Sequence, residues 1–287
     1  MARLVLVSAK PLAGKTTLTA GLSQNLRALG KSVALERRGE DANSASDSAA
    51  FGRSTSEVSS AEITLTELPA TDTPPPPDQG ARVLVVAGSG TPPAEIAEYC
   101  RAIGEQCAGV LLNRLPQKRM DAARLALGAE GLSVLGLIPE DRLLATPSLS
   151  EVVQALAGRT EHMDSNGEKP LDRPLIASIS ADPGQGYFTR YGATSVIVRS
   201  DKPDLQLAAL NAGATCLIIT GGLPVLHYVL ERASEETVPL IQTNKNTLET
   251  VAAVEALYAS TPFTGGQEKV KRAAELLADV DLAPLIG

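Results

Sequence analysis

The stretch Leu4–Thr17, LVLVSAKPLAGKTT, predicts the fold of the N-terminal region. Its four apolar residues 4–7 predict a short buried strand. After a loop, Gly14–Thr17 opens a pattern in which leucines recur at helical spacing, and Gly30 follows where a C-terminal cap is expected. We therefore predict a strand, a tight loop and a helix within the first 30 residues.

The sequence Gly14-Lys15-Thr16-Thr17 in this context is typical of a phosphate-binding P-loop. A helix N-terminus offers N–H groups and a favourable dipole to a phosphate, and Gly14 allows a close backbone approach. We expect Lys15 to reach the β- and γ-phosphates of a nucleotide, and Thr16 to bind Mg²⁺. Because Ala9 replaces the first glycine of the motif, the alternative is a strand-to-helix turn that merely contains Gly-Lys-Thr.

Other residues are expected to complete the nucleotide site. Lys10 and Ala13 belong to the loop, and Lys10 precedes Lys15 by five residues. We interpret Lys10 as a loop lysine near the phosphates rather than a dimer-bridging catalytic group. Asn113 and Arg114 end a predicted buried strand and are candidates for contact with the adenine or another base. The alternative for Asn113 is a cap on the following loop.

A charged segment follows a second predicted strand at 32–35. It supplies candidates for contact with phosphate or Mg²⁺, namely Arg37, Arg38, Asp41 and Asp47. Together with Thr16, the carboxylates of Asp41 and Asp47 are the expected metal ligands. For each charged residue, a solvated surface loop is the alternative.

The end of another predicted strand bears on catalysis. Residues 82–87 read as a strong buried strand of the parallel type, whereas residues 63–65 give only a weak strand signal. P-loop enzymes commonly end such a strong strand with an acidic residue that assists Mg²⁺ and water. The sequence here is Ala87-Gly88-Ser89-Gly90, without a carboxylate. We therefore expect weak phosphoryl transfer or none.

Composition restricts the class of protein. The chain has 287 residues, room for about two domains, and is 44% hydrophobic and 21% charged, as in ordinary globular proteins. Its net charge of −7, the 3% aromatic content and the lack of a basic run argue against a nucleic-acid partner. Three cysteines lack metal-ligand spacing, and we expect buried free thiols in a reducing cytoplasm. We expect no membrane span and no signal peptide.

We predict a mixed α/β fold in two domains. The first, residues 1–157, is a parallel-sheet domain of the P-loop NTPase type, and it ends in a helix whose Ser148 and Glu151 match a capping box. Residues 158–173 are polar and read as a linker. Residues 174–287 form a smaller α/β domain with a C-terminal amphipathic helix at 267–277.

The second domain alternates between strand and helix signals. Strands are expected at 175–179, 195–198, 216–220 and 239–242, and helices at 203–212, 223–234 and 248–259. Thr220-Gly221-Gly222, before a helix, is a possible anion nest, and Asp201 and Lys202 precede another helix. These five residues are the candidate ligand site of the second domain, and tight turns with caps are the alternative.

Longer motifs resemble known families. GKTT (14–17), GVLLNRLP (109–116) and LGLIPEDRLLATPSLSEVV (135–153) resemble the dethiobiotin-synthetase-like P-loop domain at the front of long phosphate acetyltransferases. SDKPDLQLAAL (200–210), CLIITGGL (216–223) and EKVKRAAELLADVDL (268–282) resemble the DRTGG domain that follows it in those proteins.

The resemblance implies a P-loop fold that binds a nucleotide, and a small α/β domain linked to regulation or oligomerisation. It also implies self-association as a homodimer or homo-oligomer. Because the chain ends at Gly287 without room for the acetyltransferase catalytic domain, we expect no acetyltransferase activity. Ala87-Gly88 stands where the P-loop family tends to have Glu-Gly, which favours binding over turnover.

Three functions follow from these patterns. The first is a regulatory or sensor protein that binds ATP or another nucleotide, with Mg²⁺, and hydrolyses it weakly or not at all. The second is an ATP-dependent ligase of the dethiobiotin synthetase or cobyrinic acid amide synthase type. It would use Glu36, Asp41 and Asp47 for Mg²⁺ and Arg37 to orient the substrate. The third is a structural module with a degenerate P-loop.

Overall fold

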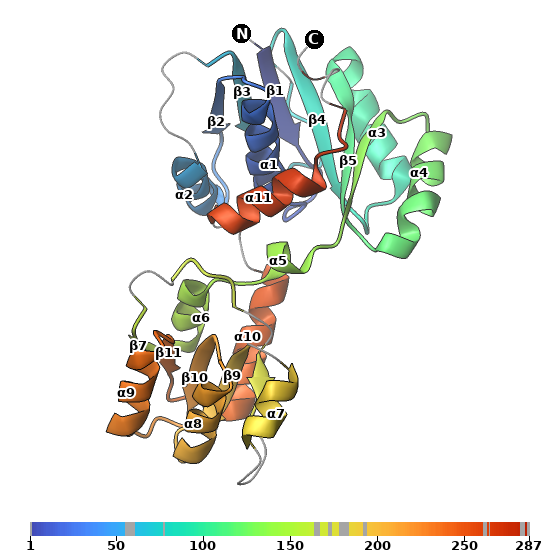
Figure 1. Cartoon of the computed structure of the whole chain (residues 1–287). Coiled ribbons are helices and arrows are strands. Elements are labelled where there is room, and N and C mark those ends of the chain that lie inside the picture. The colour runs from blue at the N-terminus through green and yellow to red at the C-terminus, as the bar shows by residue number, and fades with distance from the viewer. Residues whose placement is uncertain are drawn as a thin grey trace. The chain divides into compact units, whose positions relative to one another are not determined.

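The chain forms two compact α/β units (Figure 1). The computed structural model describes residues 2–54, 61–76, 78–163, 167–171, 174–177, 184–191, 194–260, 263, 265–281 and 285. Unit 1 consists of Met1–Leu144 and Pro262–Gly287, and unit 2 of Ala145–Thr261. The predicted mixed α/β fold class is therefore confirmed.

Unit 1 is built on a parallel sheet of six strands in the order β2-β3-β1-β4-β5-β6. The strands are β1 (Ala2–Val7), β2 (Val33–Arg37), β3 (Ile63–Glu67), β4 (Ala81–Gly88), β5 (Cys107–Leu115) and β6 (Val134–Pro139). The helices are α1 (Lys15–Ala28), α2 (Ser44–Ser54), α3 (Pro93–Ile103), α4 (Met120–Ala129), α5 (Arg142–Ala145) and α11 (Gln267–Leu276). Two short 3₁₀ turns, Gly104–Gln106 and Gln117–Arg119, precede β5 and α4.

The sheet of unit 1 is covered on both faces. Leu4 and Leu6 of β1 pack with the buried leucines of α1 and with the C-terminal segment, whereas Val5 and Val7 pack with α3 and α4. Because successive side chains of a strand alternate between faces, β1 supplies both cores at once. Buried apolar side chains on both faces explain why β1 and β4 read as continuous hydrophobic runs.

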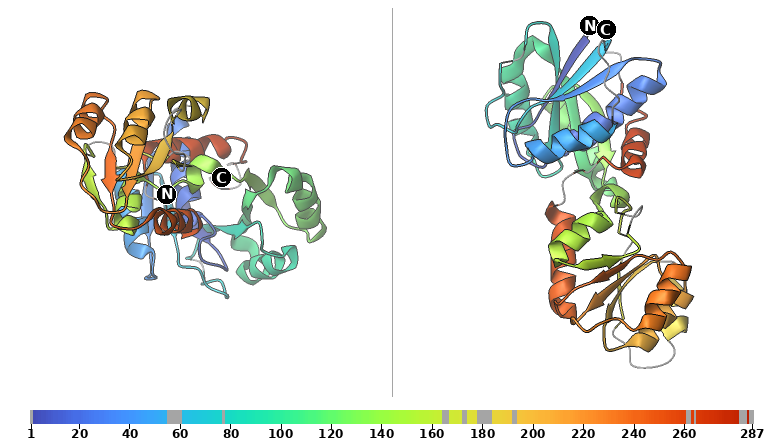
Figure 2. Two further views of the ribbon diagram at one scale, coloured as in Figure 1. Left: turned by 90° about the horizontal axis from the view of Figure 1, so that it is seen from below. Right: turned by 90° about the vertical axis from the view of Figure 1, so that its left-hand side faces the viewer.

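Helix α11 packs directly on α1, as two views agree (Figures 1 and 2). A Cβ atom on Gly21 of α1 would lie 2.8 Å from the backbone carbon of Ala273 and 2.8 Å from Leu277 Cδ1. The Asn25 side chain donates a hydrogen bond to the carbonyl of Ala274 at 2.9 Å. The lack of a side chain at Gly21 thus lets the two helices approach closely, and Leu277 is fully buried in the same core.

Unit 2 has a five-stranded sheet in the order β7-β11-β10-β9-β8, parallel except for β7. The strands are β7 (Arg159–Glu161), β8 (Leu175–Ile176), β9 (Ser195–Arg199), β10 (Cys216–Thr220) and β11 (Leu240–Gln242). The helices are α6 (Leu149–Leu156), α7 (Gly184–Tyr191), α8 (Pro203–Asn211), α9 (His227–Glu235) and α10 (Thr247–Ser260). Helices α7, α8 and α9 share one apolar core with the sheet, and α6 and α10 share another.

The structure divides the chain differently from the expected boundaries. Part of the expected linker, residues 158–173, forms β7, which pairs with β11, and Leu171 is buried in the core beneath α6. A polar sequence suits β7 because it is an edge strand. Helix α11 belongs to unit 1 rather than unit 2, because its apolar face is buried against α1.

Three local features of unit 2 can be compared with the predictions from the sequence. The capping box at the start of α6 is confirmed, since the Glu151 side chain accepts from the Ser148 N–H at 2.6 Å and Ser148 Oγ accepts from the Glu151 N–H at 3.3 Å. Residues 178–179 of the expected strand 175–179 lie outside the described residues. Helix α7, which begins at Gly184, is not among the helices predicted from the sequence.

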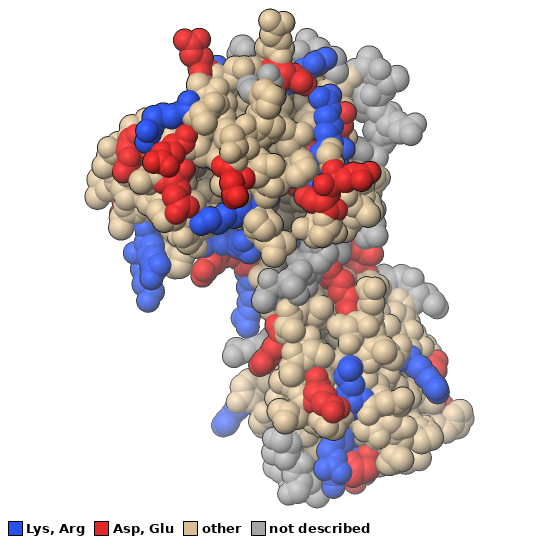
Figure 3. Space-filling view, turned by 180° about the vertical axis from the view of Figure 1, so that it is seen from behind, with Lys and Arg blue, Asp and Glu red and all other residues tan. Residues whose placement is uncertain are grey.

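Two surface properties complete the description. Among the described residues, no helix combines the length and the apolar character needed to cross a membrane. On the face shown in Figure 3, basic and acidic side chains of the described residues are interspersed rather than segregated into one stripe.

The packing of the C-terminal segment predicts a stability effect in unit 1. We expect Leu277→Ala to lower the free energy of unfolding by about 2–5 kcal/mol, because it removes a fully buried side chain and leaves a cavity. Leu125→Ala, at an exposed position of α4, should change it by less than about 0.5 kcal/mol. Urea unfolding followed by circular dichroism measures both, and equal effects would contradict this account of the packing.

Candidate functional site

The loop between β1 and α1, residues 8–14, is held in a tight turn. Gly14 has a φ of 90°, in the left-handed region, and a Cβ there would lie 2.2 Å from Asn113 Nδ2. The Asn113 side chain donates to the carbonyl of Ala13 at 3.0 Å. Glycine is therefore needed both for the backbone conformation and for the close approach of β5. Asn113, expected at a base, here fixes the loop.

Lys15 points back into this loop. Its Nζ donates to Ser8 Oγ at 2.7 Å, and Ser8 Oγ donates in turn to the carbonyl of Lys10 at 2.9 Å. Ser8 and Lys15 are both buried. Burial lowers the pKa of Lys15, and the nearby carboxylate of Glu67 opposes that change. The structure thus holds an amine under the loop, close to the start of α1.

Two carboxylates converge on the hydroxyl of Thr16. Its Oγ1 lies 2.9 Å from Asp47 Oδ1 and 3.2 Å from Glu67 Oε1. Asp47 comes from α2, and Glu67 is the last residue of β3, in register with Leu6 of β1. All three of these polar side chains are buried.

Arg37, at the end of β2, completes the group. Its Nε donates to Asp47 Oδ2 at 3.3 Å and its NH2 to Asp41 Oδ2 at 2.6 Å, and its side chain is only 2% exposed. Asp41 is therefore linked to Thr16 only through Arg37 and Asp47. The residues that meet here are named the Thr16 cluster, which comprises Lys15, Thr16, Arg37, Asp41, Asp47 and Glu67.

The electrostatics of the Thr16 cluster centre on Glu67. Burial, and secondly the negative charge of Asp47, raise the pKa of Glu67 to about 7. Glu67 Oε2 is buried and has no hydrogen-bond partner among the described residues. A buried carboxylate oxygen without a partner is costly, and a cation or a proton would relieve that cost.

The residues of the Thr16 cluster fit a Mg²⁺ ion. Thr16, Asp47 and Glu67 offer a hydroxyl and two carboxylates, the oxygen ligands that Mg²⁺ prefers. Beside them, α1 begins at Lys15 without any side-chain cap or acidic residue in its first turn. An uncapped helix N-terminus attracts anions, so a phosphate and a cation could be held side by side.

The other predicted nucleotide residues lie outside the Thr16 cluster. Exposed Lys10 pairs with Glu95 at 3.2 Å. Arg114, with a φ of 55°, donates from its guanidinium to the carbonyl of Leu12 and so braces the same loop as Asn113. Thr17 follows Thr16 in the first turn of α1.

The charged residues at the end of β2 and after it lie in two different environments. Arg38 pairs with Glu36 and with Asp78, each at 2.8 Å, on the exposed surface. Arg38 and Glu36 are therefore not brought together with Thr16, whereas Asp47, predicted as a metal ligand, contacts it. The expected alternative of a solvated loop describes Arg38 and Glu36 but not Arg37 or Asp47.

The sequence analysis missed Glu67. It sought a strand-end acid after residues 82–87, and that strand, β4, indeed ends without one. The carboxylate comes instead from β3, the other neighbour of β1 in the sheet. The signal was present as an alternating segment, residues 63–67, that ends in glutamate. The expectation for the end of β4 is confirmed, but the start of α1 obtains a strand-end carboxylate from β3 instead.

The candidate site of unit 2 is organised as turns. The N–H groups of Gly221 and Gly222 donate to the carbonyls of Lys245 and Thr243, at 2.9 and 3.1 Å. The next N–H, of Leu223, donates to Ser200 Oγ at 3.3 Å. The predicted anion nest is not formed, because these N–H groups are already used.

The side chains of that candidate site are engaged in local contacts. Thr220 is buried and its Oγ1 lies 3.0 Å from Thr247 Oγ1. Asp201 accepts from Arg199 Nε at 2.8 Å, and this contact lowers the pKa of Asp201. Lys202 stands at the N-cap of α8. The alternative of turns and caps therefore describes these residues.

Comparison with known proteins identifies part of the chain. Residues 151–257 match the DRTGG domain, which confirms that part of the resemblance and falls within unit 2. A similar solved structure is that of the CBS and DRTGG domains of the regulatory region of Clostridium perfringens pyrophosphatase, complexed with the activator diadenosine tetraphosphate. The two chains are 16% identical with a TM-score of 0.33, and the match covers 43% of this chain and 51% of that one.

The raised pKa of Glu67 predicts a pH dependence of stability. Between its ordinary pKa of 4.5 and about 7, the folded protein binds the Glu67 proton more tightly than the unfolded chain does. The free energy of unfolding should therefore fall as the pH rises through this window. We expect Glu67→Gln to remove that fall, a change on the order of a few kcal/mol.

Thermal unfolding measured across this pH range without divalent cations tests the expectation. Glu98→Gln, at an exposed position of α3, is the matched control and should leave the pH profile as it is. A Glu67→Gln profile with the same slope as the unsubstituted protein would contradict the assignment.

Proposed function

We propose that unit 1 binds a nucleotide, most simply ATP, together with Mg²⁺, and that the protein acts as a nucleotide-responsive regulator. The observation that carries this proposal is the Thr16 cluster. It gathers a lysine, a threonine hydroxyl and carboxylates at the uncapped N-terminus of α1. As part of the same proposal, the two units correspond to the N-terminal region of long phosphate acetyltransferases, and the protein is a homodimer or homo-oligomer.

Lys15 and the first turn of α1 would hold the phosphates. The lysine amine is kept near the loop by Ser8, a neutral partner that a phosphate oxygen can replace. The N–H groups at the start of α1 and the helix dipole add to the attraction. Gly14 and Asn113 support this binding by keeping the loop in its turn.

Thr16, Asp47 and Glu67 would hold Mg²⁺. When bound, the cation supplies positive charge that neutralises the phosphates. It would also remove the repulsion between the two buried carboxylates and give Glu67 Oε2 a partner. Arg37 positions Asp47, and Asp41 in turn positions Arg37.

The regulatory part of the proposal concerns unit 2. Unit 2 contains the DRTGG domain, and the chain passes from unit 1 into unit 2 and back again. A change at the Thr16 cluster that alters unit 1 could therefore reach unit 2 through two chain connections. A regulatory protein needs such coupling between a nucleotide site and a second domain.

An ATP-dependent ligase is the second candidate, and Glu67 favours it. The argument for weak turnover depended on the lack of a strand-end carboxylate, and β3 provides one. Arg37, expected to orient a substrate, is instead buried and bonded to Asp41 and Asp47. A ligase would therefore have to bind its substrate through other residues.

Nucleotide binding should depend on Lys15. We expect Lys15→Ala to weaken ATP binding by about 1.5–3 kcal/mol, roughly tenfold or more, because a charge-assisted contact is lost. The control Lys31→Ala alters an exposed lysine just beyond the other end of α1 and should leave the affinity unchanged. Isothermal titration calorimetry with ATP, with and without Mg²⁺, measures both variants. If the unsubstituted protein binds no nucleotide, the structural-module function replaces this proposal.

Turnover separates the regulator from the ligase. Phosphate release from ATP should stay near the background rate over a panel of small carboxylic acids if the protein is a regulator. A carboxylate-dependent rate that Glu67→Gln lowers by roughly a hundredfold would favour the ligase. Measuring ATP affinity in the same variant shows whether a lost rate reflects lost binding.

A further inference from the structure

A row of side chains crosses one face of the unit 2 sheet where β10 and β11 end. Arg159 of β7 is the register partner of Gln242 of β11, and Gln242 is the partner of Ile219 of β10. Because register partners point to the same face, all three lie on the side that carries α9. This face is apolar farther along, where Leu217 and Leu240 join the core with α9.

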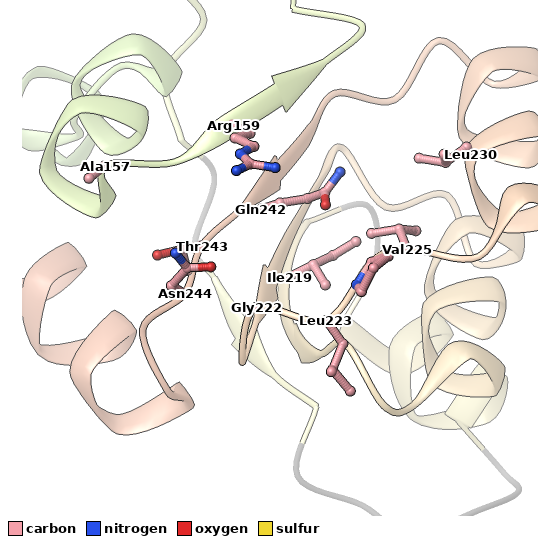
Figure 4. Close-up of a pocket in the computed structure, with 11 residues that line it drawn as sticks. Ala157, Arg159, Ile219, Gly222, Leu223, Val225, Leu230, Gln242, Thr243 and Asn244 are labelled. Atoms are coloured by element: carbon pink, nitrogen blue, oxygen red, sulfur yellow. The ribbon is translucent and has the colours of Figure 1, made fainter.

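The row forms one wall of a pocket of about 300 Å³ (Figure 4). The loop after β10 lies opposite, where Gly222 has a φ of 74° and a Cβ would come within 2.8 Å of Asn244 Oδ1. The lining residues are Ala157, Arg159, Ile219, Gly222, Leu223, Pro224, Val225, Leu230, Gln242, Thr243 and Asn244. A volume of this size is at the lower end of pockets that hold small molecules.

Three polar side chains of the pocket are available for a ligand. Arg159, Gln242 and Asn244 make no side-chain hydrogen bond or ion pair with any other described residue, although each lines the pocket. Ile219, Val225 and Leu230 provide the apolar part of the lining. None of the lining residues is acidic, so the guanidinium of Arg159 is the charge that a ligand would meet.

We infer that this pocket binds a small organic anion, one that carries a phosphate or carboxylate and is about the size of a nucleoside monophosphate. Arg159 pairs with the anionic group, because a guanidinium matches a phosphate or carboxylate with two parallel hydrogen bonds. The apolar side chains contact the body of the ligand. The amides of Gln242 and Asn244 bond to its polar edge, since each amide offers both a donor and an acceptor.

The inferred site differs from the turn predicted from the sequence. Thr220, Gly221 and Gly222 use their hydrogen-bonding groups internally, and only Gly222 of these three lines the pocket. Arg159 falls in the segment that was read as a linker. The inference does not depend on nucleotide binding by unit 1, because every lining residue belongs to unit 2.

The experiment uses the full chain with Lys15→Ala and without Mg²⁺, so that binding at the Thr16 cluster is weakened. AMP is the probe, and calorimetry measures its affinity. Adding Arg159→Gln should weaken AMP binding by roughly tenfold or more, as expected for loss of a charge-assisted pair. Adding Arg190→Gln instead, at an exposed arginine of α7, should have no effect. Titrations with citrate and with inorganic phosphate show whether an anionic group is sufficient for binding without the nucleoside.

A second measurement shows whether a loss of AMP binding is caused by a folding defect. Circular dichroism melts should coincide for the Arg159→Gln and Arg190→Gln proteins, because both positions are on the surface. Crystals soaked with AMP should show its phosphate beside Arg159. The inference is overturned if none of AMP, citrate and phosphate binds, or if AMP binds equally well without Arg159. Either result leaves the proposal for unit 1 intact, since Lys15 is already substituted.

Discussion

Two buried carboxylates meet one threonine hydroxyl, and this contact depends on the strand order of unit 1. Asp47 and Glu67 are far apart in the sequence, and they converge on Thr16 because β3 lies between β1 and β2 in the sheet. A parallel sheet brings the carboxyl ends of its strands to one edge, so the start of α1 and the end of β3 become neighbours. Arg37 pairs with Asp47, but Glu67 Oε2 has no hydrogen-bond partner among the described residues, and leaving a buried carboxylate oxygen without a partner is unfavourable. The fold therefore maintains an electrostatic cost at the place best suited to bind Mg²⁺ and phosphate.

Local sequence was sufficient where the determining residues are neighbours along the chain. The apolar run before Ala9, the glycine at 14 and the leucine spacing after it predicted β1, the tight turn and α1. Ser148 and Glu151, three residues apart, predicted the start of α6. In these cases the hydrogen bonds and the hydrophobic faces are formed within one or two turns of chain, so the sequence pattern and the structure report the same interaction.

The surroundings of Glu67, Arg159 and α11 could not be predicted, because they depend on strand order and on long-range packing. Glu67 follows a weak strand, and its closeness to Thr16 depends on which strand lies beside β1, a property that no local pattern contains. Arg159 was assigned to a linker because edge strands are short and polar. The position of α11 was likewise hidden, since an amphipathic helix shows which face it buries but not the partner. The role of Gly21, which is to let α11 approach α1 closely, becomes clear only from the structure, where Ala273 packs against it.

The return of the chain to unit 1 has a consequence for synthesis. Leu277 and its neighbours are synthesised after unit 2, yet they cover α1, which is synthesised before unit 2. All of unit 2 has been synthesised once Thr261 is added. Unit 2 can therefore fold before the C-terminal segment that packs on α1 of unit 1 has been synthesised. Nascent unit 1 therefore exposes an apolar helix face throughout the translation of unit 2, the kind of surface on which chaperones act.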